Sequence, residues 1–258
     1  MVMFFFFRDM LLYSVKILVI ALSRSGHHAI IHWIASQLPG KTLHHNNCNE
    51  NLRPTEAIQE YGSGELVSDI YNFEDFDIRG YQEVVTNEMD FDKLIFVMRD
   101  PFNWMASSLQ KGGIYANLRG LQVKRFNETD WYCPWFSRTM PRYEMYLQYA
   151  AQVERREDFV DRDFLCINYN RWVEDENYRK ELAGQLGFEF TDAGKDFVPQ
   201  FGGGSSFGDG DRDVLNRWEN YKDDAEYWEL LDERFIDFSR RYFGFEPMHR
   251  FEQGINPF

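Results

Sequence analysis

Residues 16–38 read KILVIALSRSGHHAIIHWIASQL and decide the fold. Residues 16–22 are apolar and rich in β-branched side chains, which predicts a central parallel strand covered on both faces. A small polar turn follows, and apolar residues then recur at helical spacing until Pro39 and Gly40. Such a turn aims several backbone N–H groups at one point, at the positive end of a helix dipole, and therefore predicts an anion site. The residues expected to form this site are Ser23, Arg24, Ser25, Gly26, His27 and His28.

This turn lacks the GxxxxGK[ST] pattern of nucleotide hydrolases, in which a Lys binds the β- and γ-phosphates and a hydroxyl binds Mg²⁺. Its cation is Arg24, which precedes Gly26 by two residues. The run SRSGHH resembles the 5′-phosphosulfate loop of the sulfotransferases, whose members carry Lys or Arg, then Ser or Thr, then Gly at these positions. The resemblance implies that Arg24 also acts on the transferred sulfuryl group. The alternative is an ordinary strand-to-helix turn that happens to contain an arginine.

A second motif, RDPFNWMASS, begins at Arg99 directly after the apolar residues 94–98, which predict another buried strand. Asp100 can cap a helix and Pro101 suits the first helical position, so a helix is expected there. In sulfotransferases an Arg at such a strand end, with a Ser eight residues later, binds the 3′-phosphate of the donor nucleotide; Arg99 and Ser107 have the same spacing. We expect Arg99 to lie at the strand end rather than in the core, so that Arg99→Ala leaves the fold intact.

A third motif follows residues 164–167, whose sequence FLCI predicts a strand that leads into NYNRW. Sulfotransferases have a Tyr at this strand end whose side chain lies near the adenine, and Tyr169 takes that place. The Gly/Ser-rich residues 201–210 are short for a linker, so a loop that covers a ligand is expected. Several sulfotransferases close over the 3′-phosphate with such a loop. The residues that the resemblance assigns to this loop are Gly203, Gly204, Ser205, Arg212 and Arg217.

Two segments of the chain supply candidates for the general base. Residues 41–61 contain LHHNNCNENLRP, which predicts a loop near the anion turn, where reactive side chains tend to lie. Residues 65–92 are acidic and aromatic, with Val84 and Val85 as the one strand-like segment. Asn87 stands where cytosolic sulfotransferases carry their catalytic His, which departs from the family pattern. The candidate bases are His44, His45, Glu50 and Glu88, with His45 the first choice and Glu88 the second.

The composition limits the partners. The formal net charge of −14 argues against a general binder of nucleic acid or of membrane surfaces, so local basic groups must hold any anionic ligand. The three cysteines are scattered, which indicates a reducing compartment, and the His pairs lack zinc-ligand spacing. The apolar N-terminus is interrupted by Arg8, Asp9 and Lys16, so we expect a packed lead-in and a cytoplasmic protein rather than a signal or anchor segment.

The length of 258 residues fits one α/β domain, residues 1–258, better than two small ones. Basic and aromatic side chains gather in residues 111–142, which predicts an insertion that receives the acceptor, or else a solvated insertion anchored by Trp. Helices are predicted at residues 142–156, at residues 177–186 before Gly187, and at residues 225–242.

The three motifs together resemble the sulfotransferases in order and context. The resemblance implies an α/β fold of the P-loop nucleotide-hydrolase type, with a central parallel sheet flanked by helices. It also implies transfer of a sulfuryl group from 3′-phosphoadenosine 5′-phosphosulfate to a hydroxyl of a small-molecule or glycan acceptor, without a metal ion. Two alternatives stay open: a kinase of small molecules that uses Mg²⁺ and ATP, and a nucleotide-binding module without catalytic activity.

Overall fold

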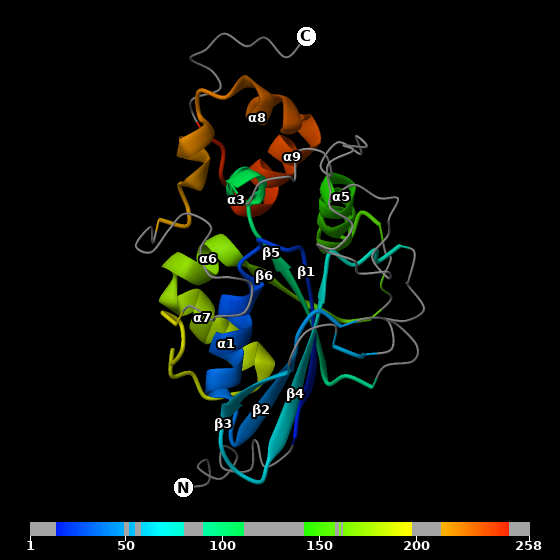
Figure 1. The fold of residues 1–258 in the computed structure, drawn as a ribbon, viewed down its shortest axis with the longest axis vertical. Helices are drawn as coiled ribbons and strands as arrows, with labels where there is room; N and C mark the ends of the chain where they lie inside the picture. Colours follow the sequence, from blue (N-terminus) through cyan, green and yellow to red (C-terminus); the bar gives the residue numbers. More distant parts are fainter. Residues whose placement is uncertain are drawn as a thin grey trace, which may run out of the picture.

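The computed structural model of the chain describes residues 14–48, 52–54, 58–79, 90–110, 142–157, 160, 162–197 and 213–247. Within them a six-stranded sheet forms the centre of the molecule, with helices on both faces (Figure 1). The strands are β1 Lys16–Ala21, β2 Lys41–His45, β3 Ile58–Gly62, β4 Val67–Glu74, β5 Lys93–Met98 and β6 Leu165–Asn168. The helices are α1 His27–Gln37, α3 Pro101–Gln110, α5 Arg142–Val153, α6 Tyr169–Glu174, α7 Glu176–Leu186, α8 Ala225–Leu230 and α9 Glu233–Phe238, with a 3₁₀ turn η2 Arg217–Tyr221 and a π-helical turn η3 Ser239–Phe243.

The order of the strands places β1 in the middle of the sheet. The order is β3-β2-β4-β1-β5-β6, and all neighbouring strands are parallel except the edge pair of β2 and β3. The predicted α/β class with a mostly parallel central sheet is therefore confirmed. The chain after β1 enters α1 on one face, whereas the chain after β5 enters α3 on the other face. Ligands of open α/β sheets bind at the carboxyl ends of strands where connections diverge in this way.

Each face of β1 contributes to its own core. Ile17, Val19 and Ala21 lie with the buried residues of α1 and α7, while Leu18 and Ile20 lie with those of α3, α5 and α9. Successive side chains of a strand point to opposite faces, so an uninterrupted apolar run is what a strand covered on both faces requires. The strands predicted at residues 16–22 and 94–98 are confirmed.

Several helix predictions are also confirmed. α1 follows the polar turn, and α3 begins after Asp100, whose Oδ1 accepts a hydrogen bond from Asn103 N at 2.8 Å as a helix cap. α5 covers most of residues 142–156. α7 ends at Gly187, which has a φ of 86°, the left-handed conformation that glycine adopts at helix ends.

Three strands were not evident from the sequence. Residues 41–61, predicted to be a loop, contain β2 and the edge strand β3, and the inner strand β4 lies in the acidic segment where only Val84 and Val85 looked like strand. Val84 and Val85 lie outside the described residues. Buried polar side chains interrupt the apolar pattern, and two of them face each other: His44 Nε2 on β2 lies 2.8 Å from Asn72 Oδ1 on β4. A hydrogen-bonded polar pair can be buried in a sheet without a large penalty.

The C-terminal segment is not the single helix predicted over residues 225–242. α8 ends and α9 begins on either side of Asp232, whose carboxylate accepts a hydrogen bond from Arg234 N at 3.0 Å and so caps a new helix. The apolar face of this segment still packs inward as expected. Its buried residues include Leu231, Phe235 and Phe238.

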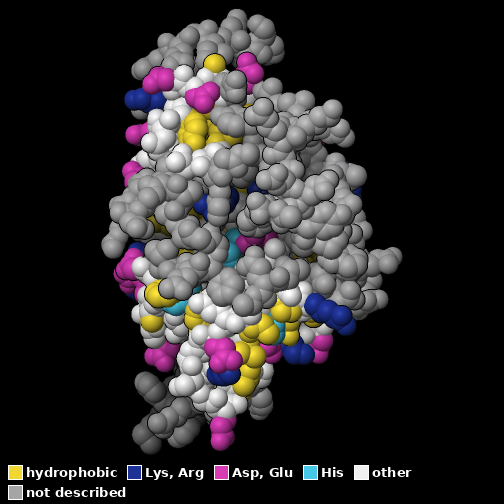
Figure 2. All heavy atoms as spheres, in the orientation of Figure 1, with side chains coloured by type: hydrophobic (Ala, Val, Ile, Leu, Met, Phe, Trp, Pro, Cys, Tyr) yellow, Lys and Arg dark blue, Asp and Glu magenta, His cyan; other side chains and the backbone are white. Residues whose placement is uncertain are grey.

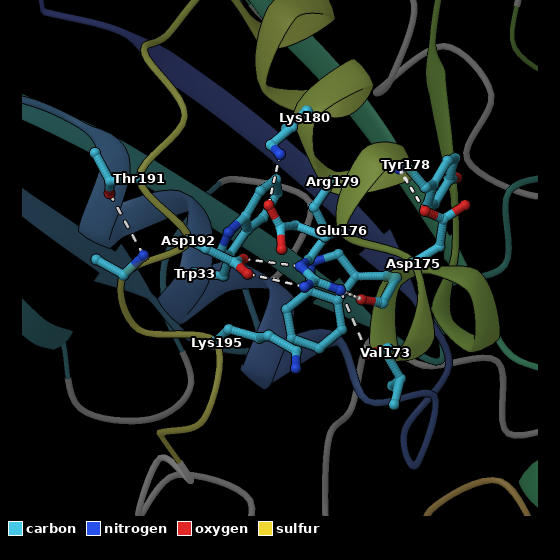
Figure 3. A network of polar contacts seen from close by, with 12 residues as sticks. Trp33, Val173, Asp175, Glu176, Tyr178, Arg179, Lys180, Thr191, Asp192 and Lys195 are labelled. Atoms are coloured by element: carbon cyan, nitrogen blue, oxygen red, sulfur yellow. Dashed lines mark hydrogen bonds and ion pairs between the residues drawn. The ribbon is translucent and has the colours of Figure 1, made fainter.

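Arg179 fixes α7 to α6 and to the chain that follows α7 (Figure 3). Its side chain is among the buried polar groups, with 4% of the residue exposed, and it donates to both carboxylate oxygens of Asp192 at 2.8 Å. It also donates to the backbone oxygen of Trp172 at 2.7 Å. The neighbouring pair of Lys180 and Glu176, 2.5 Å apart, is instead half exposed on the helix surface.

We expect Asp192→Asn to lower the free energy of unfolding by about 2–3 kcal/mol, because the buried Arg179 charge loses its anion. Asn tolerates the φ of 53° at this position, so the backbone is little perturbed. Glu176→Gln is the matched control, since it removes one charge of an exposed pair and should cost much less. Urea unfolding of both variants measures the difference, and equal losses would contradict the structural importance of the buried pair.

Candidate functional site

The turn between β1 and α1 has a backbone suited to an anion. Arg24 and Gly26 both have positive φ, 70° and 85°, a conformation in which successive peptide N–H groups can converge on one ligand. Ser25 N donates to Leu22 O at 3.1 Å and Ala29 N donates to Gly26 O at 3.1 Å, which closes the turn. Among the described residues no side chain caps α1, so an anion is the natural partner for the N–H groups of its first turn.

Gly26 lies against the ring of Tyr169. A Cβ at position 26 would overlap that ring, and the positive φ disfavours other residues as well, so the position requires glycine. Tyr169 begins α6 at the end of β6 and stacks on Trp172, with ring centroids 5.9 Å apart. Its ring also lies 5.3 Å from the guanidinium carbon of Arg99. The three sequence motifs therefore meet at this aromatic ring.

Arg99 and Arg217 converge on the hydroxyl of Ser107. Arg99 Nη1 donates to Ser107 Oγ at 2.8 Å, and Arg217 Nη1 donates to the same oxygen at 3.1 Å. Both arginines and Ser107 are buried. Two guanidinium groups this close repel each other, and an anion bound between or beside them would relieve that repulsion.

Arg99 is buried, not simply placed at a strand end as the sequence suggested. Only 2% of it is exposed, and it donates to Arg24 O at 3.2 Å and to Val214 O. Its Nε is buried and makes no hydrogen bond to any residue that the structure describes. Arg99→Ala would therefore remove structural hydrogen bonds as well as a ligand contact, contrary to the expectation that it leaves the fold intact.

The chain after the glycine-rich stretch is attached to α3, and this attachment positions Arg217. Asn103 Nδ2 donates to Leu215 O at 2.6 Å, and Trp218 N donates to Asn103 Oδ1 at 3.3 Å. Residues 201–210, with the predicted ligands Gly203, Gly204 and Ser205, lie outside the described residues, as does Arg212. The structure places Arg217, one of the two cations assigned to that loop, beside Ser107, although the two residues are far apart in the chain.

Ser23 supports the turn and uses its hydroxyl to do so. Ser23 N and Oγ both donate to the carboxylate of Asp75, at 3.0 Å and 2.9 Å. Arg142 Nη2 from α5 lies 2.6 Å from the same carboxylate, and Trp104 Nε1 donates to Ser23 O at 3.0 Å. These contacts hold the start of the turn against the ends of β4, α3 and α5.

His27 and His28 meet a carboxylate that the sequence reading missed. His27 Nε2 lies 2.7 Å and His28 Nε2 lies 3.4 Å from Glu74 Oε1, at the end of β4. His27 Nδ1 is 3.2 Å from Ser25 Oγ, and His28 Nε2 is 2.9 Å from Asn46 Oδ1. Glu74 could have been found only if β4 had been recognised as a strand parallel and adjacent to β1.

The charge state of this cluster follows from its contacts. Burial disfavours the Glu74 carboxylate, but the interaction with His27, reinforced by His28 and Arg142, outweighs it and lowers the pKa to about 2. Burial, with the adjacent His27, lowers the pKa of His28 to about 4. Burial and the nearby Arg99 also lower the pKa of Arg24. The three ligand atoms of His27, His28 and Glu74 lie within 4.8 Å of one another, so among the described residues they are a group that could hold a metal ion.

His44 and His45 point to opposite faces of β2. His44 is 1% exposed, and its ring centroid lies 5.8 Å from that of His28, on the face covered by α1. His45 Nε2 lies 2.7 Å from Asp69 Oδ1, and its ring stacks on Tyr71 at 4.2 Å, on the other face. The structure thus brings His44 into the histidine cluster, and His45 as a base stays a prediction. Glu50, Asn87 and Glu88 lie outside the described residues.

The surface around the site mixes charges of both signs. Figure 2 shows His, basic and acidic side chains together near the middle of one face, between parts of the chain drawn in grey. The insertion predicted at residues 111–142 lies outside the described residues, apart from Arg142. In the described part of the chain, no helix combines the length and the apolar character that a membrane span needs.

No protein-family model matches the chain, and no curated protein matches its sequence. Among solved structures, mouse sulfotransferase SULT7A1 complexed with PAP is similar over 93% of this chain and 89% of that chain, with 14% sequence identity and a TM-score of 0.43.

Because of the histidine cluster, we expect the free energy of unfolding to fall in mild acid. Burial, and then His28, lower the pKa of His44 to about 3, whereas an unfolded His titrates at about 6.5. Between roughly pH 7 and pH 5.5 the unfolded chain therefore gains a proton that the folded chain does not, and His44 should contribute a loss of about 1.3 kcal/mol. Urea unfolding at both pH values measures it. His44→Gln should show a pH dependence smaller by that amount, and an unchanged dependence would contradict the depressed pKa.

Proposed function

We propose that this chain transfers a sulfuryl group from 3′-phosphoadenosine 5′-phosphosulfate to a hydroxyl of a small-molecule or glycan acceptor. The observation that supports the proposal is two separate groups of cationic side chains and N–H donors, joined through one residue, which we assign as two anion sites. The first is the turn with Arg24, and the second is the cluster of Arg99, Ser107 and Arg217. Arg99 connects them by its hydrogen bond to Arg24 O. A nucleoside with phosphates on both its 3′ and 5′ positions matches two such sites.

The ring of Tyr169 supports the choice of an adenosine ligand. It lies against Gly26 of the first site and near the Arg99 guanidinium of the second, so a nucleoside that spans both sites must pass beside it. Aromatic rings stack readily on nucleobases. We assign Tyr169 to the adenine. A triphosphate is less well matched, because the turn has neither the Lys nor the Mg²⁺-binding hydroxyl of the nucleotide-hydrolase loop, and the hydroxyl of Ser23 is bonded to Asp75.

The charge of the turn suits sulfuryl transfer. The donor supplies a sulfuryl group whose bridging and equatorial oxygens gain negative charge as it passes in line to the acceptor oxygen. Arg24 and the N–H groups at the start of α1 would stabilise that charge in place, since preorganised donors need little rearrangement during the reaction. A sulfuryl group carries less charge than a phosphoryl group, so in this proposal the arginine replaces the metal ion that kinases use.

Ligand preference tests the proposal directly. Adenosine 3′,5′-bisphosphate should raise the melting temperature without Mg²⁺ and more than ATP does, because only the bisphosphate occupies both anion sites. Thermal-shift titrations with each ligand, with and without Mg²⁺, measure the preference. Stabilisation by ATP only when Mg²⁺ is present would favour a kinase, and a folded chain that binds the bisphosphate but transfers nothing to a broad acceptor panel would favour an inactive binding module.

Arg217→Met tests the second anion site with less structural damage than Arg99→Ala. It should weaken binding of the bisphosphate by roughly 10- to 150-fold, the range for one hydrogen bond to a charged group. Binding of adenosine 5′-monophosphate, which lacks the 3′-phosphate, should change little, and calorimetric titration of both ligands measures the contrast. Equal weakening of both ligands would argue against a 3′-phosphate at this cluster.

For Arg24→Ala we expect the reverse of the Arg217→Met result, a larger effect on the reaction than on binding. Because Arg24 is assigned to charge that develops during transfer, its loss should lower turnover more than bisphosphate affinity. Turnover is measured with labelled donor and the best acceptor from a panel of sugars, phenols and alcohols. A variant with normal turnover and weakened binding would place Arg24 in binding alone.

A further inference from the structure

Glu74 lies beside the anion turn, at the end of the neighbouring strand. In the register of the sheet it is paired with Ala21, the last residue of β1. The next residue, Asp75, donates its N–H to Ala21 O at 3.0 Å, and its carboxylate accepts the two hydrogen bonds from Ser23. The residue after β4 is therefore hydrogen-bonded both to the end of β1 and to the start of the turn. This keeps Glu74 at the edge of the site assigned to the sulfuryl group.

The Glu74 carboxylate is held through one oxygen and open at the other. Oε1 is the atom near His27 Nε2 and His28 Nε2, at 2.7 Å and 3.4 Å. Oε2 has neither a hydrogen bond nor an ion pair with the part of the chain that the structure describes, and 14% of the side chain is exposed. A carboxylate oriented through one oxygen has its second oxygen available to accept a proton.

The histidines of the cluster are less suited to this task. His27 has Ser25 Oγ at one ring nitrogen and Glu74 at the other, so both nitrogens are occupied. His28 Nε2 lies 2.9 Å from Asn46 Oδ1 and is engaged there. His44 is 1% exposed and its Nε2 lies 2.8 Å from Asn72 Oδ1, so an acceptor cannot reach that nitrogen. His45 lies on the opposite face of the sheet, against Tyr71.

We infer that Glu74 takes the proton from the acceptor hydroxyl, with His27 and His28 as positioning residues. This inference rests on the proposed function. In the step, the proton of the acceptor hydroxyl moves to Glu74 Oε2. The electron pair left on the acceptor oxygen forms the new O–S bond. The bond between sulfur and the bridging oxygen breaks, and its electron pair stays on the 5′-phosphate of adenosine 3′,5′-bisphosphate, so atoms and charges balance.

Donor binding makes Glu74 a better base. Contact with His27 and His28 and the nearby charges of Arg24 and Arg142 favour the ionised carboxylate. An anionic donor in the turn would neutralise part of that positive field and place a like charge beside the carboxylate. Both changes raise the proton affinity of a carboxylate, so Glu74 gains basicity when the acceptor must lose its proton.

A purely structural role is the competing explanation, in which Glu74 only holds His27 and so shapes the turn. The two roles differ in what Glu74→Gln changes. A misshapen turn would weaken bisphosphate binding, whereas a missing base would spare binding. A missing base would also spare transfer in which no hydroxyl proton is removed, such as transfer from 4-nitrophenyl sulfate to adenosine 3′,5′-bisphosphate, where a phosphate attacks and nitrophenolate leaves without protonation.

The experiment compares Glu74→Gln, Glu74→Asp and wild-type full chains. Labelled donor measures transfer to water and to the best hydroxyl acceptor of the panel, the release of nitrophenolate measures the proton-independent reaction, and calorimetry measures bisphosphate affinity. Asp92→Asn is the matched control, because it makes the same charge change at the opposite, amino end of β5, where Asp92 Oδ2 accepts a backbone hydrogen bond from Lys16 N. His45→Ala is measured alongside.

Glu74→Gln should lose transfer to hydroxyl acceptors by roughly 10²–10⁴-fold, the range for a lost acid–base group, with bisphosphate affinity and nitrophenolate release within about threefold of wild type. Glu74→Asp should recover part of the loss, and Asp92→Asn should match wild type. Weakened bisphosphate binding in Glu74→Gln, or normal hydroxyl transfer alongside an inactive His45→Ala, overturns the inference but leaves the proposed function intact. A wild-type chain that does not bind the bisphosphate overturns the proposed function itself.

Discussion

The buried guanidinium of Arg99 is the constraint on which the rest of the site depends. A charge withdrawn from water must be satisfied by hydrogen bonds or by an anion, or the folded state loses several kcal/mol. Arg99 meets part of this need with Arg24 O, Ser107 Oγ and Val214 O. These atoms belong to the anion turn, to α3 and to the chain after the glycine-rich stretch. Satisfying one side chain therefore sets the relative positions of three segments that are distant in sequence.

The elements that could be predicted are those whose pattern is set by apolar residues alone. β1 and β5 are uninterrupted apolar runs, and α7 ends at a glycine, so composition and local chemistry identified them. β2 and β4 could not be found in this way, because both buried positions of β2 and half of those of β4 are polar. His44 is tolerated in the sheet only because Asn72 faces it from the neighbouring strand. Such a pair is invisible until the strand order is known, since the two residues lie 28 positions apart.

The residues of the candidate site also differ in whether a local sequence pattern identifies them. Arg24, Gly26, Arg99 and Ser107 lie in two short motifs whose spacing carries the chemistry, so a single sequence was enough to select them. Glu74 has no motif around it. Its place beside the turn results from the parallel pairing of β4 with β1, a long-range contact that no local pattern encodes. The choice of base from sequence position alone was therefore insecure for a physical reason: the face of a strand on which a histidine lies depends on register.

The arginines of the site lie inside a chain whose net charge is −14. Exposed charges act over roughly a Debye length, about 8 Å at physiological salt, so an approaching anion meets the repulsion of the acidic surface before it reaches Arg99 and Arg217. Added salt screens the outer repulsion more than the inner attraction, since buried charges are screened less. The rate at which an anionic nucleotide associates with this protein should therefore rise with ionic strength, the reverse of the behaviour of an open basic groove.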